Sequence, residues 1–411
     1  MTDRIETTCC IAGGGPAGVM LGNLLARAGV AVLVLEKHAD FLRDFRGDTI
    51  HPSTLGVMAE LGLLEELLRL PHQPAHELAA VIDGARFAIA DFSALPVRCP
   101  FIAFMPQWDF LDFLARDAAR HPGFHLRMQA EVTGLLTEAG RVVGVQARTP
   151  AGPLEVRADL VVGVDGRGSI VRQAARLPVR RLGAPMDVLW FRLPREASDP
   201  QESMGVFGAG EILVLIDRGG HWQCGYVIPK GGFEALRARG LPDFHARLAR
   251  LAPFLAARAA AVTAWEAVKL LTVAVDRLRA WSRPGLLCIG DAAHAMSPIG
   301  GVGINLAIQD AVAAANLLAA PLRERRLRVS DLRRVQRRRA WPTWATQRLQ
   351  VLAQGRIIAR VLGGRQAPRP PLPVRLLARL PWLRRVPARL IGLGLRPEHV
   401  DPGLRGTTPV V

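Results

Sequence analysis

The stretch Gly13-Gly-Gly-Pro-Ala-Gly18 separates a short apolar run from an apolar segment over residues 16–28. The run before the glycines is typical of a buried strand, and the segment after them is typical of a helix. A second buried strand is predicted over residues 30–35, and Glu36 follows it directly. This order of strand, glycine turn, helix, strand and acid indicates a βαβ unit that binds a dinucleotide.

Each glycine of this motif has a mechanical task. Gly13 makes the tight turn, Gly15 lets the backbone approach a pyrophosphate, and Gly18 lets the helix pack closely on the strand. The start of the helix offers unpaired N–H groups and a partial positive charge to the phosphates. The carboxylate of Glu36 is expected to bind the ribose hydroxyls at the end of the second strand.

Two further motifs lie downstream, Asp165-Gly-Arg-Gly-Ser-Ile-Val-Arg172 and Gly290-Asp-Ala-Ala-His294 followed by Pro298-Ile-Gly-Gly-Val-Gly303. The carboxylate in the third motif follows an apolar strand, where it can accept hydrogen bonds from a sugar-alcohol chain. The glycine turn then brings bare backbone close to a flat ligand. The next helix begins there, and its positive end stabilises a reduced, anionic ring. Together the motifs describe a long cofactor held at both ends, which fits FAD better than NAD.

The remaining hydrophobic patterns divide the chain into two kinds of sheet. Residues 158–164 and 285–289 are nearly continuous apolar runs, as in strands buried on both faces of a parallel sheet. Residues 78–90 and 186–228 alternate, which favours antiparallel strands. The predicted fold class is α/β: a doubly wound, Rossmann-like FAD-binding domain of the GR2 type, interrupted by an antiparallel β-sheet substrate domain and followed by a helical C-terminal region. The predicted boundaries are 1–72, 99–178 and 271–320 for the FAD-binding domain, 73–98 and 179–270 for the substrate domain, and 321–411 for the helical, arginine-rich region.

With the three motifs in this order, the chain resembles the class A flavoprotein monooxygenases of the para-hydroxybenzoate hydroxylase fold over about residues 7–320. The resemblance implies that an arginine after the second strand and a glutamine ahead of a helix contact FAD, and that backbone near residue 132 meets the adenine. It also implies that the central motif, with Arg172, serves both FAD and NAD(P)H. The expected cofactor-binding residues are Gly13, Gly15, Pro16, Ala17, Gly18, Glu36, Lys37, Arg46, Gln107, Val132, Asp165, Gly166, Asp291, Pro298, Gly301, Val302, Gly303, Ile304 and Asn305.

The resemblance implies an FAD-dependent monooxygenase. NADH or NADPH, bound transiently, reduces FAD, and O2 forms a flavin C4a-hydroperoxide that hydroxylates an apolar small molecule of aromatic or polyketide-like type. One alternative is a flavin-dependent dehydrogenase or reductase of a lipid-like substrate. Another is a flavin halogenase, because residues 221–229 partly match a signature of such enzymes. The non-enzymatic alternative is a basic membrane-binding or partner-binding protein that keeps the fold alone.

The sequence defines the substrate-binding residues less clearly than the cofactor-binding residues. Five aromatic residues on the alternating segments either line an apolar pocket or form the core of the sheet, namely Trp190, Phe191, Phe207, Trp222 and Tyr226. Tyr226 is the single tyrosine, so paired tyrosines that activate a phenol, as in para-hydroxybenzoate hydroxylase, are absent. No catalytic acid or base is assigned, and His294 is expected to be mainly structural. No cluster of residues has the spacing of a metal site.

The net charge of +17 comes from one region near the C-terminus. Residues 323–405 hold 21 arginines against four acidic residues, and the rest of the chain is balanced. This basic region is interpreted as a solvated helical face, as a surface for an anionic membrane or a cover for the substrate entrance, or as a nucleic-acid site. Nucleic acid is the least favoured partner, because no recognition module accompanies the charge.

The cysteines and the N-terminus bear on the compartment. The chain has five cysteines, an odd number without metal spacing, and its first residues do not form a secretory signal. A cytoplasmic location is therefore expected, with peripheral contact at the inner face of the membrane as an option. The expected partners are a small apolar substrate and O2, and the expected assembly is a monomer or a homodimer.

Overall fold

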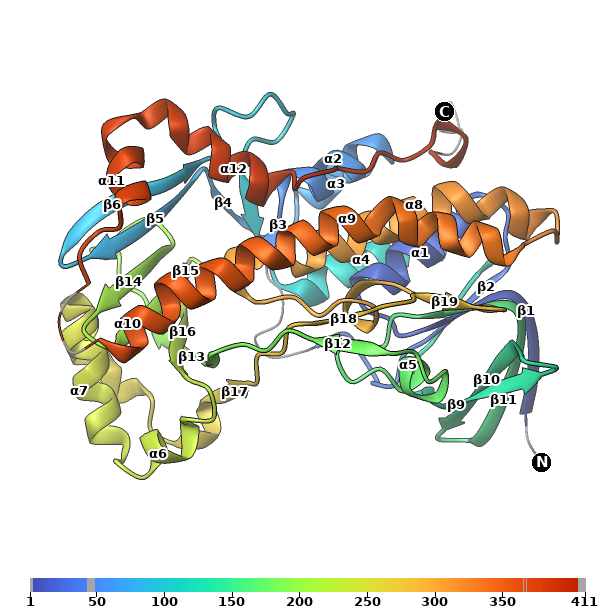
Figure 1. The fold of residues 1–411 in the computed structure, drawn as a ribbon, viewed down its shortest axis with the longest axis horizontal. Coiled ribbons are helices and arrows are strands. Elements are labelled where there is room, and N and C mark those ends of the chain that lie inside the picture. Colours follow the sequence, from blue (N-terminus) through green and yellow to red (C-terminus); the bar gives the residue numbers. More distant parts are fainter. Residues whose placement is uncertain (1–2, 43–48, 365, 367, 406–411) are drawn as a thin grey trace.

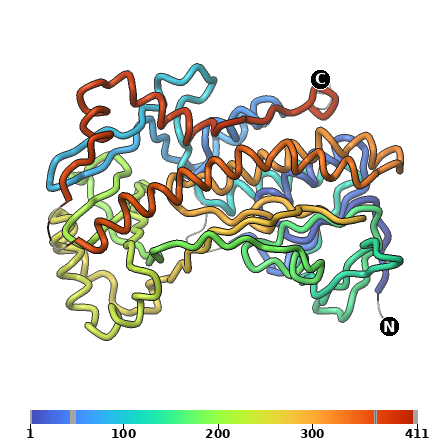
Figure 2. Tube along the Cα trace, viewed as in Figure 1, coloured from blue at the N-terminus to red at the C-terminus, as the bar shows by residue number. Residues whose placement is uncertain are grey.

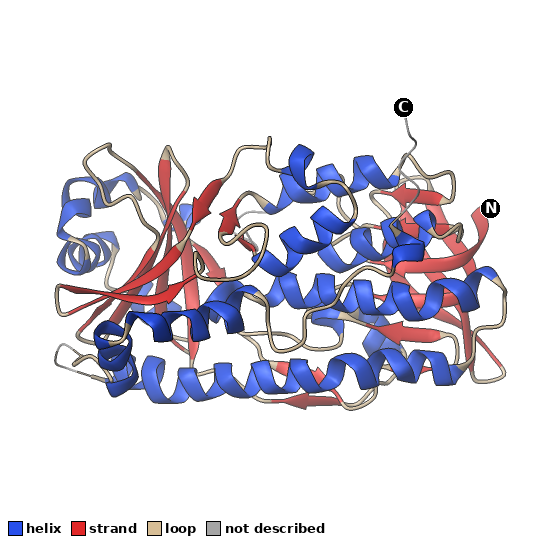
Figure 3. Cartoon of the chain, turned by 90° about the horizontal axis from the view of Figure 1, so that it is seen from above, coloured by secondary structure: helices blue, strands red, loops and turns tan. Residues whose placement is uncertain are grey.

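The computed structural model describes residues 3–42, 49–364, 366 and 368–405. Two large sheets lie at opposite ends of an elongated molecule, with long helices between them (Figures 1 and 3). Strands β1, β2 and β9–β11 lie at the right of Figure 1, and strands β5, β6 and β14–β16 lie at the left. The mixed α/β fold with a helical C-terminal region is confirmed.

The larger sheet has eight strands among the described residues, in the order β19-β20-β11-β1-β2-β8, and β10 and β9 extend from β11. From β20 through β11, β1 and β2 to β8, each adjacent pair is parallel. The apolar runs of β1, β2, β11 and β20 predict this arrangement. The strands are β1 (Asp3–Ala12), β2 (Val32–Leu35), β8 (Phe124–Arg127), β9 (Glu131–Glu138), β10 (Arg141–Thr149), β11 (Gly152–Gly163), β19 (Ser282–Arg283) and β20 (Leu286–Cys288).

The second sheet has seven strands among the described residues, in the order β17-β13-β16-β15-β14-β5-β6. Its pairs are antiparallel except β14 and β5, which run parallel, so the predicted antiparallel arrangement is confirmed with this one exception. The strands are β5 (Glu77–Ile82), β6 (Ala85–Asp91), β13 (Met186–Pro194), β14 (Met204–Gly208), β15 (Glu211–Asp217), β16 (His221–Pro229) and β17 (Lys269–Leu271).

Two small sheets connect these parts. One has the order β3-β7-β4, with β3 (Thr49–Ile50), β4 (Gln73–Ala75) and β7 (Ile102–Phe104). The other pairs β12 (Val179–Arg181) with β18 (Asp276–Leu278). Residues 179–181, which the sequence assigned to the substrate domain, therefore pair with the segment ahead of β20. The domain boundaries themselves stay a prediction.

Helix α1 packs on β1 and β2 of the larger sheet and contacts both α4 and α8. The α-helices are α1 (Pro16–Arg27), α2 (Pro52–Glu60), α3 (Leu64–Leu67), α4 (Gln107–Ala118), α5 (Ile170–Ala174), α6 (Phe233–Arg237), α7 (Leu241–Leu251), α8 (Gly303–Arg323), α9 (Val329–Ala353), α10 (Ala359–Gly363), α11 (Leu372–Arg379) and α12 (Arg385–Gly392). The short 3-10 and π segments are η1 (Pro253–Ala261), η2 (Trp265–Ala267), η3 (Gly290–Ala292), η4 (Ile299–Gly301), η5 (Gln354–Ile358), η6 (Pro381–Arg384) and η7 (Pro402–Leu404).

One helical stretch, Ile299–Arg323, is long and apolar enough to cross a membrane. Most of it is α8, and 83% of its apolar window is buried inside the protein. Its neighbours include α1 and α9. This helix is apolar because it is surrounded by protein, as the central helix of a core is.

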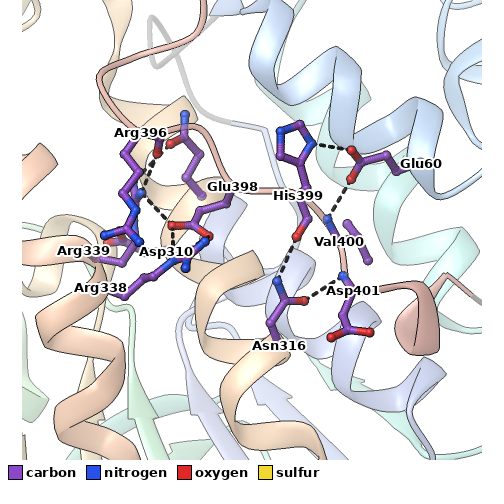
Figure 4. Close-up of polar contacts among 11 residues, drawn as sticks. Glu60, Asp310, Asn316, Arg338, Arg339, Arg396, Glu398, His399, Val400 and Asp401 are labelled. Carbon is purple, nitrogen blue, oxygen red and sulfur yellow. Dashed lines mark hydrogen bonds and ion pairs between the residues drawn. The ribbon is translucent and has the colours of Figure 1, made fainter.

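The last described segment returns along the helices to the opposite end of the molecule (Figure 2). We call residues 394–405 the C-terminal strap. Arg338 and Arg339 of α9 both bind Glu398 of the strap, and the side chain of Arg339 is fully buried (Figure 4). Glu60 of α2 accepts hydrogen bonds from His399 Nδ1 at 2.6 Å and from Val400 N at 2.7 Å. The basic region is therefore not only a solvated face, because part of its charge is internal.

Candidate active site

The first glycine motif forms a turn in which the first and last glycines have no space for a side chain. Gly13 has φ +114°, and a side chain there would lie 2.6 Å from the carbonyl oxygen of Val164. A side chain on Gly18 would lie 2.0 Å from the carbonyl oxygen of Gly13. At Gly15, by contrast, no protein atom lies within 4 Å of the position a Cβ would take. The first N–H groups of α1 have no side-chain cap, so the turn leaves both space and donors for an anionic ligand.

Glu36 lies beside this turn. Its Oε2 accepts a hydrogen bond from Gly14 N at 2.9 Å, and its Oε1 accepts one from His38 N at 3.1 Å. The neighbouring Lys37 is exposed. Ala130 N donates to the carbonyl oxygen of Glu36 at 2.8 Å, which brings the start of β9, with Val132, close to the same edge.

The three motifs meet because they follow three adjacent parallel strands, β1, β11 and β20. The carboxyl ends of parallel strands share one edge of a sheet, where ligands of such folds bind. Arg167 connects the second motif to the third, since its Nε lies 3.3 Å from Asp291 Oδ2. The side chain of Asp291 is 36% exposed and stays accessible to a ligand. The structure therefore places Gly13, Asp165 and Asp291 at one edge of the larger sheet, and their contact with a cofactor stays a prediction.

The central motif contains two buried polar atoms without a protein partner. Asp165 Oδ2 accepts a hydrogen bond from Val171 N at 3.1 Å, whereas Asp165 Oδ1 has none. One terminal nitrogen of Arg167 is also buried and unpartnered. Buried polar groups normally have partners, so these atoms fit a polar ligand at the same edge. The guanidinium of Arg172 binds Asp276 at 3.2 Å, and the role that the resemblance implies for Arg172 stays a prediction.

The glycine turn of the third motif uses left-handed backbone at two positions. Gly300 has φ +78° and Gly301 has φ +63°, values that favour glycine. Thr49 fills the space next to Gly301, and its hydroxyl donates to the carbonyl oxygen of Gly301 at 2.9 Å. Helix α8 begins at Gly303 without a side-chain cap, which leaves its positive end open. Pro298, Val302 and Ile304 flank this turn.

Asn305 is predicted to contact the cofactor, but its side chain is occupied within the protein. Its Oδ1 accepts hydrogen bonds from His51 N at 3.0 Å and from Thr54 Oγ1 at 2.7 Å. The residue thereby attaches the start of α8 to α2, and a cofactor contact would fall to its backbone. Gln107 is the first residue of α4. Arg46 lies outside the described residues.

Sequence reasoning missed the carboxylate that supports the third motif. Asp310, on the buried helix α8, accepts hydrogen bonds from Gly290 N at 3.1 Å and from Arg339 Nε at 2.9 Å. It also lies 2.5 Å from His294 Nε2, so His294 is a structural residue, in accord with the expectation. Burial alone would raise the pKa of Asp310, but His294 and Arg339 lower it below its ordinary value. The signal in the sequence is an acidic residue within an otherwise apolar helix.

The second sheet divides the five aromatic candidates between its two faces. Phe191, Trp222 and Tyr226 lie in a core that includes residues of α7 and η1. Tyr226 is buried there, and its hydroxyl donates to Glu211 Oε1 at 3.0 Å. Trp190 and Phe207 lie on the other face, in a cluster that includes Ile299 of the glycine turn. Only these two therefore remain candidates for a substrate pocket.

Comparisons with known proteins agree with this geometry. The FAD binding domain family matches residues 6–347. A 6-methylpretetramide 4-monooxygenase of Streptomyces rimosus is 35% identical over 398 residues, which cover 94% of this chain and 93% of that protein. Several other curated relatives are longer, and the chain covers 60–64% of their length.

Two solved structures show the same fold. The p-nitrophenol 4-monooxygenase of Pseudomonas putida has a TM-score of 0.78 at 21% identity and covers 96% of this chain and 100% of its own. The P. aeruginosa protein PqsL, solved in complex with 2-aminobenzoylacetate, has a TM-score of 0.73 at 24% identity and covers 87% of this chain and 99% of its own. With three FAD motifs converging on one sheet edge, the chain belongs to the FAD binding domain family and is a class A FAD-dependent monooxygenase.

Proposed function

We propose that the protein hydroxylates an apolar, aromatic polyketide-like molecule, with NAD(P)H as reductant and the C4a-hydroperoxide of FAD as the oxygen donor. One observation carries the proposal: the three motifs meet at one sheet edge. This edge has open space at Gly15, and the N-terminal ends of α1 and α8 have no side-chain cap there. The relative from S. rimosus supports the substrate class, because 6-methylpretetramide is an aromatic polyketide and the similarity covers nearly the whole chain.

The residues have separate tasks in this proposal. The turn at Gly13–Gly18 and the start of α1 hold the pyrophosphate, and Glu36 holds the adenosine ribose. Asp165 and Asp291 accept hydrogen bonds from the sugar-alcohol chain. The positive end of α8 stabilises negative charge on the reduced ring, and the backbone of the glycine turn excludes water from the same side.

The substrate side is apolar in this proposal. Trp190 and Phe207 project from the face of the second sheet that packs near Ile299, together with Val188 and Val227. Such an apolar surface suits a flat apolar molecule, and a few polar groups would fix the orientation of that molecule. Tyr226 is hydrogen-bonded on the opposite face of the sheet, so it does not act on the substrate. If the substrate is a phenol, it would lose its proton to water rather than to a tyrosine.

The reaction is tested by rapid mixing. The FAD-loaded protein is reduced with NADPH, or with NADH in a parallel run, in the presence of an aromatic polyketide and without oxygen. On mixing with O2 we expect an absorbance transient between the reduced and oxidised flavin spectra, together with a hydroxylated product. Substrate turnover that proceeds equally well without oxygen would instead identify a dehydrogenase or reductase.

The site assignment is tested by Asp291→Ala. Loss of a charge-assisted hydrogen bond costs about 1.5–3 kcal/mol, so FAD affinity should fall roughly 10- to 150-fold. The measurement is the FAD dissociation constant of the apoprotein by flavin fluorescence. Asp243→Ala is the matched control, because Asp243 pairs with Arg247 on α7, away from the three motifs. An Asp291→Ala protein that binds FAD as tightly as the parent would refute the assignment.

We also propose a reducing compartment, the cytoplasm, as the place of this reaction. All five cysteines are free and buried, and none is paired in a disulfide. Disulfides are rare where glutathione keeps thiols reduced. Cell fractionation followed by thiol labelling of the unfolded protein should find five reactive thiols in the cytoplasmic or membrane-bound fraction.

A further inference from the structure

Two consecutive helical segments near the C-terminus expose an apolar stripe. On α11 and the residue after it, Leu372, Leu376 and Leu380 follow one another at intervals of four. Trp382, Val386 and Leu390 repeat this spacing over η6 and α12. Residues four apart lie on the same face of an α-helix, so Leu372 and Leu376 share one face of α11, and Val386 and Leu390 share one face of α12. The exposed fractions are high, with 71% for Leu372 and 59% for Trp382.

Four exposed arginines lie on the same two helices, namely Arg375, Arg379, Arg385 and Arg389. We call the six apolar residues and these four arginines the arginine–leucine surface. No acidic residue occurs between Asp331 and Glu398 in the sequence. The surface therefore combines large apolar side chains with positive charge that has no acidic neighbour along the chain.

The opposite side of these helices is anchored to the protein. Both α11 and α12 contact β6, the edge strand of the second sheet, and Ala388 and Leu393 are buried against Phe92. The helices thus cover an open sheet edge, and α12 buries Ala388 and Gly392 on its inner side. The six apolar side chains stay exposed to solvent, with exposed fractions of 38–71%.

We propose that the arginine–leucine surface docks on an anionic lipid membrane. Helices with arginines beside exposed leucine and tryptophan lie in the interfacial plane, where apolar groups enter the acyl boundary and guanidinium groups meet lipid phosphates. A second copy of the chain fits poorly, since a symmetric contact would place the arginines of both copies against each other. Nucleic acid fits poorly too, because six large apolar groups would face its phosphates.

The surface adjoins the site of the proposed reaction. Ile391 of α12 packs against Met296, Val302 and Leu306 around the glycine turn, and His51 Nδ1 donates to the carbonyl oxygen of Ile391 at 2.7 Å. Docking would therefore place the cofactor turn close to the bilayer, from which an apolar substrate is drawn. This part of the inference rests on the proposed function, whereas membrane binding itself does not.

The test uses the full-length, FAD-loaded protein without substrate. We expect it to sediment with vesicles of equal parts phosphatidylcholine and phosphatidylglycerol, to ignore vesicles of phosphatidylcholine alone, and to be released as salt rises. Each arginine near an anionic surface contributes about fivefold in partitioning, so Arg385→Gln with Arg389→Gln should weaken binding about 25-fold. Trp382→Ser should weaken it as well.

Matched variants keep the test specific. Arg237→Gln with Arg239→Gln removes the same charge from exposed positions at the end of α6, and Trp341→Ser removes a tryptophan of similar exposure from α9. Binding should be unchanged in both. Equal losses in these controls, equal binding to both kinds of vesicle, or self-association without vesicle binding would each overturn the proposal. FAD retention and NADPH oxidation in solution are recorded separately, so a failure of docking is distinct from a failure of the monooxygenase reaction.

Discussion

Replacing Gly15 with alanine should leave the protein folded and remove most of its FAD. Its φ of −74° and ψ of −176° are values that alanine adopts without strain, and no protein atom lies within 4 Å of the new methyl group. The methyl group meets nothing until the pyrophosphate approaches the turn. Overpacking costs about 1–3 kcal/mol, so we expect FAD affinity to fall roughly 5- to 150-fold.

The measurement compares FAD affinity with the unfolding midpoint of the apoprotein. Gly56→Ala is the control, since Gly56 also has no protein atom within 4 Å of the new group but lies on α2. It should leave FAD affinity unchanged and raise the unfolding midpoint slightly, because alanine favours a helix interior over glycine. Gly18→Ala shows the contrasting behaviour, because its methyl group would lie 2.0 Å from the carbonyl oxygen of Gly13 and destabilise the fold itself. Full FAD affinity in Gly15→Ala would mean that the pyrophosphate lies elsewhere.

Replacing Asp310 with asparagine should destabilise the protein more than any other single charge removal that we propose. Asp310 and Arg339 are both fully buried, and they contact each other at 2.9 Å. Asparagine removes this ion pair and leaves the buried Arg339 with Glu398 as its remaining carboxylate partner, and breaking a buried pair costs up to about 3–5 kcal/mol. Asparagine would also turn an N–H group toward a neighbour that is itself a donor, either Gly290 N or Arg339 Nε, because these two groups bind different oxygens of Asp310. We therefore expect weaker FAD retention in addition to lower stability.

The measurement is the free energy of unfolding in urea, for the apoprotein and the FAD-loaded protein. Asp243→Asn is the control, because Asp243 pairs with Arg247 at 2.7 Å but is 37% exposed, and such pairs contribute about 1 kcal/mol or less. A loss of the same small size in Asp310→Asn would show that the network around α8 does not stabilise the fold.

The carboxylate of Asp310 should also make the stability of the protein depend on pH. The folded-state pKa of Asp310 lies below its ordinary value of 3.8. Its contribution to stability is therefore present above pH 3.8 and is lost as the pH falls through the lower folded-state pKa. The difference in stability between the parent and Asp310→Asn should accordingly narrow in strong acid.

Several features of the fold were predictable because they depend on local backbone chemistry. Glycine turns such as Gly13–Gly18 tolerate few other residues, and continuous apolar runs such as β20 indicate strands buried on both faces. The motifs also follow strand ends, so their meeting at one sheet edge could be expected for Asp165 and Asp291. The alternation over residues 186–228 likewise predicts antiparallel strands but does not say which face of them is covered.

Other features depend on contacts between distant segments. Helix α9 continues through Pro342, a residue that usually ends or kinks a helix. The C-terminal strap crosses back to α2, where Glu60 binds His399, 339 positions later in the chain. Neither the period of the hydrophobic pattern nor any local motif predicts such features. Contacts between residues far apart in the sequence form only when the helices pack together.

The sequence by itself determined the cofactor, the order of the three motifs and the α/β class, since each rests on residues whose required backbone or strand position is a local property. Only the tertiary structure decided that Trp190 and Phe207, and not Tyr226, face the glycine turn, and that Arg339 is an internal cation while Arg385 is an exposed one. The physical reason is that burial and pairing belong to the packed molecule: the same arginine side chain is stable in the core beside Asp310 and stable at the surface beside water.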